Sequence, residues 1–311
     1  MKNELFRLLA AALTIAVSIS ACSDKKTGET TSEVTETTLI TEEETTTTET
    51  TIESTVETTT AETIGNQVYI YRVGEDGSKS LRGIERYDEQ GKVIYQAACK
   101  NDKLESELFY DYEGDNLIKS QEKTYGQFNG DVTTDYTYSD GNLVSEIGHG
   151  SYVSDSSASY TSDIETIYTY DNGKLVEKKT TRIDHEADDY KTVERIEYVY
   201  DGDNVSTESH YKTSTNLDTE VLFFVISFEY DSEGRVINEI NQMANSSNKA
   251  VISYEYDDNG LLVRCETDAE NIGMNMVVEY QYDSEGRKTS LTTTTVDNGK
   301  TTVTVDEYEY L

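Results

Sequence analysis

The 311-residue sequence has no proline and no tryptophan, and its basic residues are scarce. Only 26 Lys and Arg stand against 61 Asp and Glu, which gives a formal net charge of −35. Nucleic-acid binding requires basic side chains that neutralise phosphates, so this composition argues against a nucleic-acid partner. Solubility outside the cell is the simplest interpretation of the acidity, and attraction of cations or basic partners is the alternative.

Motifs that carry catalytic chemistry are also missing. His149, His185 and His210 are the only histidines, and none has a second histidine at metal-ligand spacing. No nucleophile elbow, P-loop or dinucleotide-binding glycine motif occurs. Carboxylates are too numerous for spacing alone to single out a catalytic pair. We therefore expect no enzyme, no catalytic residues and no cofactor.

The sequence has one long apolar run, residues 8–20, which follows the positively charged start MKNELFR. The run is shorter than the roughly 20 residues that span a bilayer. It ends in Ile19-Ser20-Ala21-Cys22, which resembles the lipobox of bacterial lipoproteins. The resemblance implies that residues 1–21 are a signal peptide, that Cys22 carries the lipid, and that the chain is anchored on the extracellular face of the cell membrane.

Residues 22–66 are dominated by Thr and Glu and show no strand or helix periodicity. Such a segment buries too little apolar surface to fold, so we expect a disordered tether with a span of roughly 35–40 Å. A tether of this length favours a Gram-positive host with a thick cell wall. The other two cysteines, Cys99 and Cys265, lie in different repeats, and we expect small, partly buried side chains rather than a disulfide.

Residues 67–311 contain about nine copies of one motif: an aromatic residue, any residue, Tyr, usually Asp, and then a turn with Gly. The alternation of strand side chains places both rings of a copy on one face, while Asp and Gly shape the turn. The motif residues predicted to be structural are Tyr87, Asp88, Gly91, Tyr110, Tyr112, Gly114, Tyr136, Tyr138, Gly141, Tyr168, Tyr170, Asp171, Gly173, Tyr198, Tyr200, Asp201, Phe228, Tyr230, Asp231, Gly234, Tyr254, Tyr256, Asp257, Gly260, Tyr280, Tyr282, Asp283 and Gly286.

Each copy predicts two antiparallel strands, so the fold is expected to be all-β, a continuous meander of roughly 17–19 strands. The motif resembles the YD repeats of RHS-type bacterial proteins, most closely at residues 228–235, 254–261 and 280–287. The resemblance implies a structural, non-catalytic sheet that spirals into a shell. Nine copies are too few for a large closed cage, so we expect a curved or partly rolled sheet with its Tyr face on the concave side.

Two features of the repeats leave alternatives open. The acidic turns at 113–116, 201–204 and 257–259 offer oxygen ligands for calcium, although ordinary turn chemistry also explains them, and no metal site is predicted. The Tyr face is either core or a platform for sugar rings.

The leading functional hypothesis is a surface-anchored, non-catalytic binding or adhesion module for a glycan or protein. A structural spacer without a ligand is the alternative, and an enzyme is the least favoured possibility. An exposed aromatic patch would distinguish the first two, because a spacer has no use for one.

Overall fold

The computed structural model describes residues 66–311, apart from 127, 155–157, 218, 248 and 270–273. The chain divides into two units, Met1–Ile64 and Gly65–Leu311, and the described residues belong to the second. The predicted signal peptide, the lipid on Cys22 and nearly all of the predicted tether therefore lie outside the described residues.

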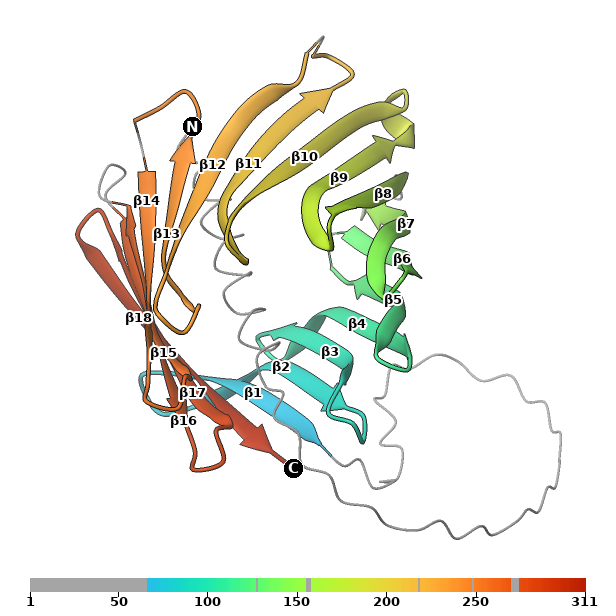
Figure 1. Ribbon diagram of the computed structural model, residues 1–311. Coiled ribbons are helices and arrows are strands. Elements are labelled where there is room, and N and C mark those ends of the chain that lie inside the picture. Colours follow the sequence, from blue (N-terminus) through green and yellow to red (C-terminus); the bar gives the residue numbers. More distant parts are fainter. Residues whose placement is uncertain (1–65, 127, 155–157, 218, 248, 270–273) are drawn as a thin grey trace, which may run out of the picture. The chain divides into compact units, whose positions relative to one another are not determined.

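The described residues form eighteen strands and one short 3₁₀ helix (Figure 1). The strands are β1 (Gln67–Val73), β2 (Lys79–Tyr87), β3 (Val93–Lys100), β4 (Lys103–Glu113), β5 (Asn116–Thr124), β6 (Phe128–Ser139), β7 (Asn142–Ser154), β8 (Ser159–Asp171), β9 (Lys174–Asp184), β10 (Tyr190–Asp201), β11 (Asn204–Ser214), β12 (Val221–Tyr230), β13 (Val236–Met243), β14 (Lys249–Tyr256), β15 (Leu262–Ala269), β16 (Met274–Tyr282), β17 (Lys288–Asp297) and β18 (Lys300–Tyr310). The helix η1 (His185–Ala187) joins β9 to β10.

The strands close into an antiparallel barrel, with each strand paired to its neighbours in sequence. The ring is completed between β1 and β18, where Val68 pairs with Tyr310 on one side and with Glu85 of β2 on the other. The predicted all-β meander is confirmed, but the partly rolled open sheet is wrong. A single layer of eighteen tilted strands can close on itself, and closure removes the two exposed edges that an open sheet would have.

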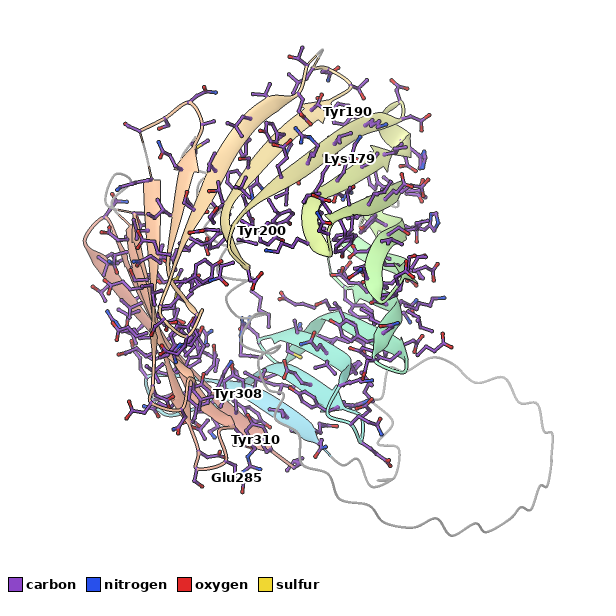
Figure 2. All side chains as sticks on the ribbon, in the orientation of Figure 1. Lys179, Tyr190, Tyr200, Glu285, Tyr308 and Tyr310 are labelled. Carbon is purple, nitrogen blue, oxygen red and sulfur yellow. The ribbon has the colours of Figure 1, made fainter. Side chains whose placement is uncertain are left out.

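The two faces of the barrel wall differ. The face that carries the Tyr-x-Tyr rings, here called the inner face, holds most of the buried residues, including Ile252 at 1% and Tyr280 at 4% exposure. In Figure 2, Tyr200 and Tyr308 lie on the inside of the ring of strands. The outer face carries many charged side chains. Val199, the residue between the two Tyr of one copy, lies on this face and is 55% exposed.

The two ends of the barrel also differ. The repeat turns gather at one end, here called the turn end, and span only two to five residues, as between β10 and β11 or between β12 and β13. Both termini of the barrel lie at this end, because the Leu311 amide donates to the Gln67 carbonyl at 3.0 Å. The connections at the opposite end, here called the loop end, are more varied and include η1. The segment that precedes residue 66 therefore joins the barrel at the turn end.

Candidate functional site

The repeat turns owe their shape to the predicted Asp and Gly. In the turn after β12, Asp231 Oδ1 accepts hydrogen bonds from the amides of Glu233 at 3.0 Å and Arg235 at 2.9 Å. Gly234 adopts φ of 80°, a left-handed conformation that glycine takes without strain. Asp88, Asp257 and Asp283 accept the same pair of amide bonds in their own turns.

The second Tyr of a copy connects neighbouring repeats. Tyr256 donates its hydroxyl to the carbonyl of Val236 at 2.9 Å, in the return strand of the preceding copy. Seven tyrosines make this bond, and we call the set the Tyr ladder: Tyr112, Tyr170, Tyr200, Tyr230, Tyr256, Tyr282 and Tyr310. Because these hydroxyls satisfy backbone carbonyls, the ladder rings are structural rather than a free sugar platform.

Basic residues just after the turns cover the ladder rings. Lys174 lies 5.1 Å from the ring centroid of Tyr200 and forms an ion pair with Asp203 at 3.1 Å. Lys92 over Tyr112, Arg235 over Tyr256 and Arg287 over Tyr310 repeat the arrangement. This contact was not predicted, although Lys or Arg recurs in the sequence directly after the turn glycine. It also accounts for the acidic turns at 113–116 and 201–204, where Asp115 and Asp203 pair with lysines.

The first Tyr of a copy bonds to side chains instead of the backbone. Tyr168 donates to Glu146 at 2.6 Å, and Tyr254 donates to Glu239 at 3.1 Å. Glu239 is 7% exposed, and burial raises the pKa of its carboxyl. The hydrogen bonds from Asn241 and Tyr254 act in the opposite direction. These pairs satisfy polar groups that would otherwise be costly to place on the inner face.

A second group of aromatic residues lies on the outer face, apart from the repeat motif. Tyr95 of β3 and Phe109 of β4 have ring centroids 5.2 Å apart, with an interplanar angle of 59°. Tyr125 follows β5 and is 40% exposed. Glu107 connects them, because Tyr95 donates to its Oε1 at 2.8 Å and Tyr125 to its Oε2 at 2.5 Å. We call Tyr95, Phe109, Tyr125 and Glu107 the aromatic patch.

Two cations border the aromatic patch. The guanidinium carbon of Arg86 lies 4.6 Å from the centroid of Tyr95, and Lys123 Nζ lies 5.6 Å from that of Phe109. Burial and the hydrogen bond to Glu107 raise the pKa of Tyr95, and the hydrogen bond to Glu107 raises that of Tyr125 to about 12, so both stay protonated as donors at neutral pH. Rings held in place with donors and acceptors at their edges suit recognition of a polyhydroxylated ligand.

The histidines are less isolated than their spacing in sequence indicates. Asp163 of β8 accepts from His149 Nδ1 at 2.7 Å and lies 3.0 Å from His185 Nε2. His185 Nδ1 also contacts Asp189 at 2.7 Å, and these carboxylates raise its pKa. Pairing of β7 with β8 places His149 opposite Asp163, so two histidines that are distant in the sequence contact one carboxylate. Within the described residues, no group of three or more His, Cys, Asp or Glu side chains is arranged to hold a metal.

The two cysteines of the barrel are free and buried, with exposures of 5% for Cys99 and 1% for Cys265. Burial is the main cause that raises the pKa of both thiols, that of Cys265 to about 12. The expectation that the two cysteines form no disulfide is confirmed, and burial disfavours the reactive thiolate form of both.

Comparisons with known proteins give little further information. No protein-family model matches the chain, and no curated protein matches it. Among solved structures, a porin-like protein from Bacteroides uniformis matches at 12% identity and a TM-score of 0.38, over 79% of this chain and 97% of that protein. A likeness at that TM-score carries no argument about this chain. No helix in the described ranges has the length and hydropathy to cross a membrane.

Proposed function

We propose that the protein is a lipid-anchored, non-catalytic surface module whose barrel binds glycan through the aromatic patch. The observation that carries the proposal is the presence of outer-face rings that take no part in the Tyr ladder. Tyr95 and Tyr125 both donate to Glu107, so their rings are positioned relative to one another before a ligand arrives. Preorganised aromatic groups lose little entropy on binding, which favours recognition over a purely structural role.

The charges on the wall support a barrel that lies in water rather than in lipid. Lys179, Arg195 and Glu279 are mid-strand residues of the outer face. Charged side chains on a lipid-facing strand cost about 2–4 kcal/mol each at the bilayer midplane for Arg or Lys. The lipid on Cys22 would then be the attachment to the membrane, and the loop end would point away from the turn end, where the tether joins.

The binding proposal is tested on a glycan array with the full chain. The Tyr95→Ala and Phe109→Ala variants should each lower the affinity for any bound glycan by about tenfold or more, because each removes one stacking ring. Tyr211→Ala is the matched control, since Tyr211 also lies beside an arginine, Arg195 at 4.2 Å, and donates to Glu197 at 3.0 Å. No selective signal from folded protein would leave the structural spacer as the better hypothesis.

Anchoring is tested by fractionation of cells that express the chain. The chain should partition with the membrane, and a Cys22→Ser variant should appear in the soluble or secreted fraction, because serine offers no thiol for acylation. Mass spectrometry of the parent protein should show an N-terminus at Cys22 with added acyl mass. Membrane retention of the Cys22→Ser variant at the parent level would contradict the lipid anchor.

A further inference from the structure

The inner face contains a cation, Lys288, that forms no ion pair with the described residues. Lys288 opens β17, and its Nζ lies 5.1 Å from the ring centroid of Tyr280 and 5.5 Å from that of Tyr308. No carboxylate of the described residues lies within ion-pair distance of this ammonium. Burial lowers the pKa of Lys288 below the ordinary lysine value. A partly buried ammonium without a partner is costly to maintain for structure alone.

A buried hydroxyl beside this cation also has no partner. Tyr280 is 4% exposed, and among the described residues its hydroxyl and that of Ser162 are the only buried side-chain polar atoms without a hydrogen bond. Among the other first tyrosines, Tyr110 donates to Gln96, Tyr168 to Glu146 and Tyr254 to Glu239. Buried polar groups without a hydrogen bond are rare in folded proteins, so the Tyr280 hydroxyl indicates an acceptor that the described residues do not supply.

The acidic group that interacts with Lys288 does not form an ion pair with it. Glu85 of β2 interacts electrostatically with Lys288, but its carboxylate is already engaged. Its Oε2 accepts from Tyr87 at 2.6 Å and its Oε1 from Gln96 at 3.1 Å. The titratable groups around Lys288 are therefore Glu85, Tyr280, Tyr308 and Tyr310, and none of them is an unoccupied anion at neutral pH.

We propose that Tyr280, Lys288 and Tyr308 form a second binding site, on the inner face, for the carboxylate of a small organic acid. The ammonium supplies the charge, the Tyr280 hydroxyl donates a hydrogen bond, and the two rings contact the apolar body of the ligand. Val278 at 2% and Cys265 at 1% exposure make the surroundings of Tyr280 apolar. An acid with a hydrocarbon body suits this lining better than a fully hydroxylated sugar does.

The site is tested by calorimetric titration of the full chain with octanoate and benzoate, with octanol as the uncharged control and inorganic phosphate as the alternative anion. Both carboxylates should bind with saturation and octanol should not. Lys288→Met and Tyr280→Phe should each weaken octanoate binding by about tenfold to a hundredfold, because each removes a charge-assisted hydrogen bond. Lys174→Met is the matched control, since Lys174 also covers a Tyr ring but already has Asp203 as its partner.

The pH dependence gives a further readout. Lys288 binds a carboxylate only while it is protonated, so affinity should fall as the pH rises through its lowered pKa. The Tyr280→Phe variant keeps the ammonium and the shape of the ring, so its result does not depend on the stability of Lys288→Met. Absence of saturable binding, equal binding of octanol, selective binding of phosphate alone, or unchanged affinity in both variants would each overturn the proposal.

Discussion

A chain that ends at Gly299, and so lacks β18, is expected to lose the cooperative thermal transition of the full protein. Removal of β18 abolishes two strand pairings at once, with β17 and with β1. It also removes Tyr308, Tyr310 and the ion pair in which Arg72 Nε lies 2.5 Å from Asp306 Oδ1. The loss should be comparable to the whole stability of a typical protein, about 5–15 kcal/mol.

Melting followed by circular dichroism and limited proteolysis measures this loss. The shortened chain should be digested rapidly and should aggregate, since β1 and β17 become exposed edges. Leu311→Ala is the control, because the Leu311 side chain is 76% exposed and the substitution keeps the amide that donates to Gln67, so the melting temperature should stay unchanged. A cooperative transition of the shortened chain within a few degrees of the parent would mean that the repeats are stable as an open sheet.

Local structure could be predicted from the sequence because each signal lies within one copy of the motif. Tyr256, Asp257 and Gly260 are close in sequence, and their spacing alone indicates a strand followed by a tight turn. Closure depends instead on the pairing of Val68 with Tyr310, the first and last strands, which no local spacing encodes. The strands were therefore predicted correctly. The open sheet was wrong because the pairing of β1 with β18 joins the two ends of the repeat region.

The candidate sites were harder to predict for a related reason. Tyr95, Phe109 and Tyr125 come from consecutive segments but occupy no fixed position of the repeat, so they join only through the register of β3, β4 and β5. Lys288 was recognisable only as a departure, because YQYDSEGRK is the copy in which no aliphatic residue follows the turn. This departure distinguishes the copy in the sequence, but only the folded structure shows that the Tyr280 hydroxyl has no hydrogen-bond partner among the described residues.

Replacement of a single ladder tyrosine is expected to destabilise the barrel in two measurable steps. Tyr256→Phe removes only the hydrogen bond to the Val236 carbonyl, so the free energy of unfolding should fall by about 0.5–1.5 kcal/mol. Tyr256→Ala also removes the ring that Arg235 covers at 4.8 Å, and the loss should reach about 3 kcal/mol. Urea unfolding of the full chain measures both values.

Tyr160→Phe is the control, because Tyr160 is 43% exposed and lies outside the ladder, so its hydroxyl should contribute nothing measurable. Equal effects of Tyr256→Phe and Tyr160→Phe would show that the ladder hydrogen bond makes no net contribution to the free energy of unfolding.

The sequence itself indicates that the hydroxyl at the second ring position matters. The first ring position accepts Glu85 and Phe228, whereas the second is Tyr in every copy, as expected where the hydroxyl must reach the carbonyl of the preceding repeat. The hydrogen bond between repeats thus explains why Tyr rather than Phe stands at the seven ladder positions, since Phe would fill the same volume without it.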